Sequence, residues 1–117
     1  MAEINKPKVF ITQVPHTKDK LSGQQIPTVN INPAYEHGEI VVMMPPRAAF
    51  YATNELVRQM KEHLKNYNFE RGDSIVALGD PAIIGVAFAI LGQTFGKFTV
   101  LKWDKNLGRY IPNKVFI

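Results

Sequence analysis

Two short, continuous apolar runs with a helical stretch between them limit the fold more than any other feature of the sequence. The runs Glu39–Met44 and Ser74–Leu78 are typical of strands that are covered on both faces. Between them, apolar residues recur at three- and four-residue steps from Phe50 to Tyr67, which predicts an amphipathic helix. A helix between two buried strands is the unit of a parallel sheet, so the two strands are expected to lie side by side in the same direction.

A second helix is expected from Pro81 to about Phe95. Asp80 is a good N-cap, and Pro81 is a good first helical residue because proline has no N–H to leave unpaired. The segment is apolar nearly all round, so this helix must be covered on more than one side. Either residues 15–38 or a second copy of the chain would supply the additional cover.

Three further segments complete the predicted sheet. Lys8–Val14 is rich in β-forming residues and precedes a proline. Phe98–Trp103 and Arg109–Ile117 flank a turn-rich stretch and predict a terminal hairpin. Pro112 places the last strand at an edge of the sheet, because proline cannot donate a hydrogen bond to a neighbouring strand.

We therefore expect one α/β domain over residues 1–117, with a small Rossmann-like, mostly parallel sheet flanked by two helices and a C-terminal antiparallel hairpin. Helices on opposite faces would give three layers, and helices on one face would give two. Residues 1–7 are expected to be flexible. Residues 15–38 are interpreted as a long irregular connection with a short extended piece at Thr28–Ile31, and connections of this length are often functional.

The amino-acid composition excludes several kinds of chemical site. The chain has no cysteine, which excludes disulfides and thiolate metal sites. Its three histidines lack metal-ligand spacing, so neither a metal nor a cofactor is expected. Against 10 Asp and Glu there are 14 Lys and Arg, and this net charge of +4 is scattered along the chain. Such a net charge is compatible with weak attraction to nucleic acid or to an acidic partner, and it does not distinguish between these two partners.

No signal peptide or membrane span is expected. The residues after Met1 include no apolar core of a signal sequence, and the longest apolar run, Ala82–Leu91, is about half as long as a bilayer core is thick. We therefore expect a cytoplasmic protein without a membrane partner.

A first candidate site lies at the predicted carboxyl ends of the strands, where ligands of open parallel sheets gather. Arg47, Gly79, Asp80 and Ala82 would meet there, and the free N–H groups at the start of the second helix would favour a phosphate. Capping is the favoured alternative, because an Asp80 carboxylate occupies the same N–H groups and repels an anion. The surrounding residues match neither common phosphate-binding glycine motif.

A second candidate site is the C-terminal hairpin, where aromatic and basic side chains alternate. Such a mixture can stack on bases and bind phosphates, or it can bind a protein partner. The alternative is an ordinary edge hairpin with one face packed on the core. The residues concerned are Lys102, Trp103, Lys105, Arg109 and Tyr110.

Evidence for catalysis is weak. Asp80 and Asp104 would meet at the strand ends, and paired carboxylates can perform acid–base chemistry. Each is more simply explained as a helix cap or a turn residue. No serine has the context of a hydrolase nucleophile. The sequence therefore offers no catalytic constellation and favours a protein that is not an enzyme.

Several short motifs resemble a family of small bacteriophage-encoded proteins of unassigned function. These motifs are Asn32–Ile40 (NPAYEHGEI), Gly79–Pro81 (GDP), and Leu101–Asp104 (LKWD) followed by Tyr110. The resemblance implies a phage accessory or host-interaction protein in the host cytoplasm, and it assigns no catalytic residue.

The functional expectation is a small phage-type protein that acts through protein–protein binding, either as a monomer or as a homodimer. The alternative is a module that binds nucleic acid or a nucleotide phosphate through the strand ends and the basic hairpin.

Overall fold

The structure is a computed structural model that describes residues 6–46 and 53–117. Arg47 and Phe50 lie outside the described residues, as do residues 1–5 of the segment that was expected to be flexible.

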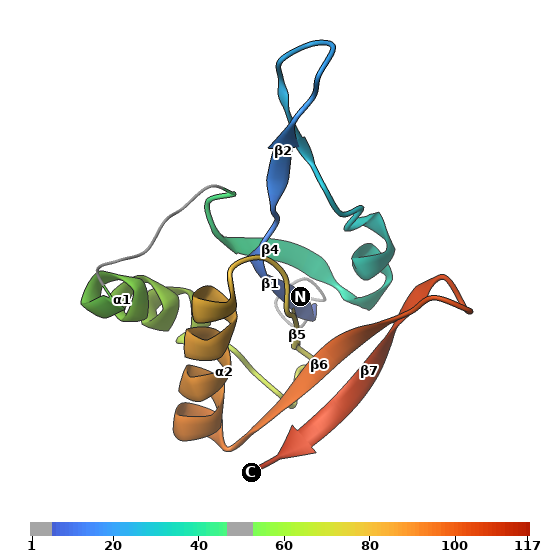
Figure 1. The fold of residues 1–117 in the computed structure, drawn as a ribbon. Helices are drawn as coiled ribbons and strands as arrows, with labels where there is room; N and C mark the ends of the chain where they lie inside the picture. The colour runs from blue at the N-terminus through green and yellow to red at the C-terminus, as the bar shows by residue number, and fades with distance from the viewer. Residues whose placement is uncertain (1–5, 47–52) are drawn as a thin grey trace.

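Five strands form the main sheet, in the order β4-β1-β5-β6-β7 (Figure 1). β1, β4, β5 and β6 run in the same direction, and β7 is antiparallel to β6. The α/β class, the mostly parallel sheet and the C-terminal hairpin are thus confirmed, and the strand that contains Pro112 is an edge strand. The bounds are Lys8–Gln13 for β1, Glu39–Met44 for β4, Ser74–Val76 for β5, Lys97–Asp104 for β6 and Arg109–Phe116 for β7.

The prediction that the strands at 39–44 and 74–78 are neighbours is wrong, because β1 lies between them. Phe10 of β1 is paired with Val41 on one side and with Ile75 on the other. Both flanking strands still run in the predicted direction. β1 takes the centre since every one of its residues after Lys8 is buried, and a central position covers a strand on both faces and both edges.

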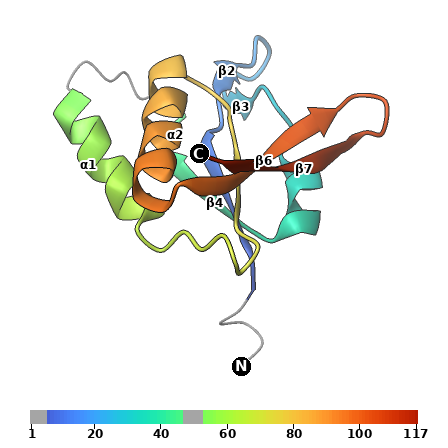
Figure 2. The same cartoon turned by 90° about the horizontal axis from the view of Figure 1, so that it is seen from below.

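Both α-helices, α1 (Thr53–Leu64) and α2 (Pro81–Phe95), cover the same face of the sheet (Figure 2). Leu56 and Leu91 belong to one buried cluster together with Phe10 of the sheet. The two connections that contain these helices cross the sheet in one direction, from β4 to β5 and on to β6. Because such crossovers are right-handed, they place their helices on one face, which is the two-layer alternative.

A 3-10 helix that the sequence did not predict, η2 (Asn32–His37), covers part of the opposite face. Its Ala34 is fully buried in a cluster with Val9 and Ile11 of β1. The connection from β1 to β4 crosses the sheet in the opposite direction, so the same handedness rule places it on the opposite face. The expectation that residues 15–38 cover α2 is therefore wrong, and α1 packs against α2 instead.

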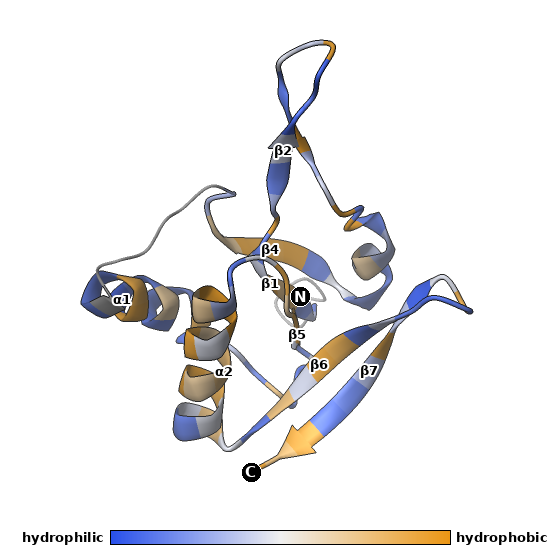
Figure 3. Ribbon diagram, viewed as in Figure 1, coloured by the Kyte–Doolittle hydropathy of each residue, from blue (hydrophilic) through white to orange (hydrophobic). Residues whose placement is uncertain are grey.

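The first part of this connection is a β-hairpin rather than an irregular segment. β2 (His16–Lys18) and β3 (Gln25–Pro27) pair with each other and extend away from the main sheet, and both are mostly hydrophilic (Figures 1 and 3). The expected extended piece at Thr28–Ile31 is not a strand. Strands this short and polar show no apolar alternation. A hydrogen bond in the turn between the two strands stabilises the hairpin instead: Ser22 Oγ donates to Asp19 Oδ2 at 2.6 Å.

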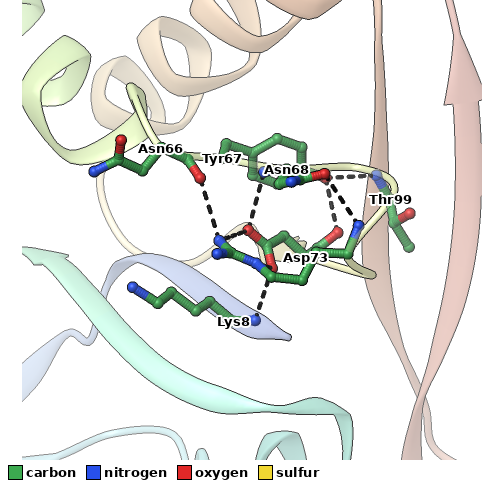
Figure 4. A network of polar contacts seen from close by, with 7 residues as sticks. Lys8, Asn66, Tyr67, Asn68, Asp73 and Thr99 are labelled. Carbon is green, nitrogen blue, oxygen red and sulfur yellow. Dashed lines mark hydrogen bonds and ion pairs between the residues drawn. The ribbon is translucent and has the colours of Figure 1, made fainter. Parts of the chain in front are cut away.

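The amino ends of β1 and β5 are joined by the buried carboxylate of Asp73 (Figure 4). It accepts hydrogen bonds from the backbone N–H of Lys8 at 2.9 Å and from that of Asn68 at 3.0 Å. The guanidinium of Arg71 completes the arrangement, with Nε 2.9 Å from Oδ1. The Asp73 side chain is 0% exposed and that of Arg71 is 18% exposed, so this ion pair is almost entirely removed from water.

Tyr67 extends this network to β6. Its hydroxyl donates to the Asp73 carbonyl at 2.9 Å and accepts from the Thr99 N–H at 3.0 Å (Figure 4). Burial raises the pKa of Tyr67 to about 12, so the hydroxyl keeps its proton throughout the physiological pH range. One loop between α1 and β5 therefore fixes the amino ends of three strands.

Asp73→Ala is expected to lower the free energy of unfolding by about 3 to 5 kcal/mol, because it leaves a shielded guanidinium and two N–H groups without their partner. Urea denaturation followed by far-UV circular dichroism measures the change. The control is Glu70→Ala in the same loop, which removes a solvent-exposed ion pair with Lys97 and should leave the midpoint almost unchanged. Equal midpoints for the two variants would contradict the assigned role of Asp73.

Candidate functional site

A pocket of about 670 Å³ lies at the carboxyl ends of β5 and β6, on the side of the sheet that η2 covers. This is the end of a parallel sheet at which ligands usually bind, and the volume is that of a typical ligand site. The lining is mainly apolar. It consists of Val29, Asn30, Pro33, Val76, Ala77, Leu78, Val100, Leu101, Lys102, Trp103 and Tyr110.

The pocket exists because β5 and β6 separate. Ile75–Val100 is the one bridge between these two strands within the described residues, whereas β6 continues to pair with β7 as far as Asp104. β5 was expected to reach Leu78 and ends at Val76. Ala77, next to three buried residues, is exposed. A strand position that β5 leaves empty beside β6 thus becomes part of the pocket.

Thr12 accounts for this separation. Its Oγ1 accepts a hydrogen bond from the Leu78 N–H at 2.8 Å and lies within hydrogen-bond distance of the Leu78 carbonyl. The same hydroxyl lies 3.4 Å from the carbonyl oxygen of Val76. A fully buried side chain of β1 therefore binds the chain that follows β5 and holds it beside β1 rather than beside β6.

Two aromatic residues form one wall of the pocket. The rings of Trp103 and Tyr110 meet edge to face, with centroids 5.0 Å apart. Tyr110 is buried, and this burial raises the pKa of its hydroxyl. Trp103 is 49% exposed, so it presents a large apolar surface to solvent at the mouth of the pocket.

The opposite wall is held in place by contacts between η2 and β7. His37 Nε2 lies 2.9 Å from the carbonyl oxygen of Tyr110, and since a carbonyl only accepts, Nε2 carries the hydrogen. Glu36 accepts two hydrogen bonds from the guanidinium of Arg109, at 2.9 and 3.2 Å. These contacts join the NPAYEHGEI motif to the residues after LKWD, and Pro33 of this motif lines the pocket together with Trp103.

The residues predicted to bind phosphate are arranged as a helix cap. Asp80 Oδ1 accepts from the Ala82 N–H at 2.7 Å, and Asp80 is the N-cap of α2. This is the arrangement that the sequence offered as the alternative to phosphate binding. Gly79 lies beside the cap, and Arg47 lies outside the described residues.

Gln13 fills the crevice at the carboxyl ends of β1 and β5. Its Oε1 accepts from the Asp80 N–H and its Nε2 donates to the Pro45 carbonyl, both at 2.8 Å. Gly79 permits this contact because its φ is +89°, and a Cβ there would stand 2.3 Å from Gln13 Oε1. One backbone N–H of the predicted phosphate site, that of Asp80, is thus already bound by a side chain of the protein itself.

The residues predicted on the hairpin fall into two groups. Lys102, Trp103 and Tyr110 line the pocket. Lys105 is exposed in the turn, and Arg109 is engaged by Glu36. The structure therefore brings three of the five together around an apolar opening.

Sequence reasoning missed the remaining wall of the pocket. Val29, Asn30 and Pro33 belong to the connection that was interpreted as irregular, and Ala77 was placed inside a strand. The one available signal was the unusual length of that connection, which is common for segments that form binding sites.

The two carboxylates that were predicted to meet at the strand ends are each bound by nearby backbone N–H groups. Asp104 Oδ1 accepts from the backbone N–H groups of Asn106 and Leu107, both at 2.9 Å, as a turn residue does. Asp80 is committed to its own helix in the same way. Residues 6–46 and 53–117 contain no group of three or more side chains that could ligate a metal ion. Within the same ranges, none of the helices combines the length and the apolar character that a bilayer span requires.

Gly79→Ala is expected to lower the free energy of unfolding by about 1 to 3 kcal/mol, because it strains the backbone and displaces the Gln13 amide. Gln13→Ala should also destabilise the fold, since it leaves the Asp80 N–H and the Pro45 carbonyl without this partner. In the double variant the clashes with Oε1 and Cδ of residue 13 are removed, and only the clash with its Cβ remains. The double variant should therefore lose less stability than the sum of the two single losses. Urea denaturation of all four proteins measures this coupling, and strict additivity would contradict the proposed contact.

Comparison with known proteins identifies the family. The model of a family described as Phage Pam3 gp32-like protein matches residues 7–117. No curated protein and no solved structure matches the chain significantly. This match confirms the resemblance to phage proteins of unassigned function. Since the match spans all but the first six residues, the chain belongs to the phage Pam3 gp32-like protein family.

Proposed function

We propose that this phage protein is an accessory protein that acts by binding another protein, and that the apolar pocket beside Trp103 is its binding site. The observation that supports this proposal is the combination of a large, mainly apolar pocket with a half-exposed tryptophan at its mouth. Tryptophan is among the residues that contribute most to binding energy at protein interfaces.

The character of the lining favours a protein partner. Apolar side chains from four segments converge on the pocket, and Lys102 is the one permanently charged residue among those that line it. A partner that inserted an apolar side chain would bury surface that is now in contact with water. At about 25 cal/mol per Å² of apolar surface, this burial provides the main driving force for association.

The alternative of nucleic-acid binding has less support. Arg109, one of the basic residues predicted to bind phosphates, already forms a two-point contact with Glu36. The carboxylate of Asp104 lies next to Trp103 in the chain and would repel a nucleic-acid backbone. Electrostatic attraction supplies most nonspecific affinity for nucleic acid, so these pairings reduce the effective charge.

A homodimer is one form that the proposed interaction could take. The apolar character of α2 favours a second copy as its cover, and α1 already covers much of that apolar surface. The remaining exposed side of α2 carries the small residues Ala82, Gly85 and Ala89. A second copy, a host protein and another phage protein are therefore the partners that the experiment must separate.

The test uses site-specific photo-crosslinking in host cells infected with the phage that encodes this chain. A benzophenone amino acid replaces Trp103 in one protein and Leu107, an exposed turn residue outside the pocket, in the control. We expect light-dependent crosslinking to one discrete protein from position 103 and not from position 107. Mass spectrometry identifies the partner as a second copy, a host protein or a phage protein.

A variant separates pocket binding from chance proximity. Leu78→Trp enlarges a half-buried side chain on the face of the sheet where the pocket lies, so it should fill the pocket and reduce the crosslinked product at least tenfold. Circular dichroism checks that this variant is folded. Identical products from positions 103 and 107, or a product that Leu78→Trp does not reduce, would contradict the proposal. Crosslinks to nucleic acid alone, together with oligonucleotide binding that Lys102→Glu abolishes at low salt, would support the alternative instead.

A further inference from the structure

We infer that the ligand of the pocket is an extended peptide segment, which pairs with β6 in the place that β5 leaves empty. This inference rests on the proposed function, and it specifies the mode of binding. It depends on the direction of backbone groups rather than on the apolar lining alone. These directions follow from hydrogen bonds on either side of the pocket.

On the β5 side, the backbone groups of Ala77 face the pocket. Leu78 directs its N–H toward β1, where Thr12 Oγ1 binds it. Consecutive residues of an extended chain direct their backbone groups to opposite sides, so the N–H and carbonyl of Ala77 point toward β6. Neither group of Ala77 forms a hydrogen bond with another residue in the described part of the chain.

On the β6 side, alternate residues face away from β7. The Thr99 N–H binds the Tyr67 hydroxyl, and the Asp104 carbonyl binds the Gly108 N–H within the hairpin. The backbone groups of Thr99 therefore point toward β5, and those of Asp104 point toward β7. By the same alternation, Leu101 and Trp103 direct their backbone groups toward β5.

Beyond the Ile75–Val100 bridge, these directions leave β6 with donors and acceptors that face an open space. In a continued parallel ladder, the Leu101 carbonyl and the Trp103 N–H would both bind Ala77. Because Thr12 holds the chain after Val76 beside β1, the ladder ends, and residues 77, 101 and 103 line the pocket instead. A ligand that supplies backbone N–H and carbonyl groups at the spacing of a strand restores these hydrogen bonds.

Side chains of the pocket define the residues that such a segment would carry. Val76, Leu101 and Tyr110 form an apolar surface on the side of the sheet that η2 covers. Every second side chain of an inserted strand would point toward this surface. The inference therefore commits to an extended segment with apolar residues at alternate positions, which is the chemistry of binding by β-strand addition.

The experiment begins with a selected probe. A random library of linear 12-residue peptides is depleted on the Leu78→Trp variant and then selected on the unmodified protein. The tightest peptide is synthesised, and its affinity is measured by titration of the fluorescence of Trp103, the one tryptophan of the chain. Leu78→Met, which retains a side chain of similar size and the same backbone groups, should bind this peptide as tightly as the unmodified protein does.

A scan of N-methylated peptides then tests backbone pairing. Methylation at every second position of the bound segment, where the N–H groups face β6, should weaken binding about tenfold per methyl group. Of the positions between them, only the one that pairs with Ala77 should be sensitive. Amide hydrogen exchange measured by NMR should show new protection of Ala77 and Trp103 in the complex, with no change at Leu107.

The outcomes separate this inference from the proposed function. Failure to select a peptide, tolerance of N-methylation at every position, or unchanged exchange at Ala77 and Trp103 would overturn strand pairing. Photo-crosslinking from position 103 would still test protein binding in each of these cases, because it does not depend on the shape of the ligand. A crosslink without alternating N-methyl sensitivity would therefore keep the pocket as a protein-binding site and reject the extended mode.

Discussion

The buried carboxylate of Asp73 is the interaction on which the rest of the sheet depends. It binds the first backbone N–H of β1 and the loop that leads into β5, and its ion pair with Arg71 fixes that loop. Tyr67, in the same loop, adds a contact to β6. Three parallel strands thus begin at one common point, and their relative register is set there.

At the other end of the sheet, side chains of β1 divide the strands into two groups. Gln13 connects β1 to the chain after β4 and to the start of α2, and Thr12 connects it to the chain after β5. No comparable side-chain contact holds β5 to β6 at this end within the described residues. Strands that begin together therefore separate toward their carboxyl ends, and the pocket is the space that this separation creates.

Much of the fold follows from local patterns in the sequence. Local sequence signals predicted three kinds of element correctly. They are the apolar runs of β4 and β5, the periodic apolar residues of α1, and the Asp80–Pro81 start of α2. Strand order carries no such signal, because β1, β4 and β5 are similarly apolar and long-range pairing decides which one is central. The β2–β3 hairpin and η2 were missed for a related reason, since their polar residues are held by individual contacts rather than by an apolar face. The candidate site was predicted in part: Trp103 and Tyr110 stood out by type, whereas Ala77 became part of a pocket only through the hydroxyl of Thr12.

The central position of β1 has a consequence for how the molecule assembles. The Lys8–Asp73 contact that fixes the amino end of β1 spans 65 residues of sequence. Contacts between residues so far apart lose much chain entropy when they form, and proteins rich in them fold slowly. β5 follows β1 in the chain, so until β5 has left the ribosome one edge of the central strand lacks its neighbour and its apolar side chains lack part of their cover.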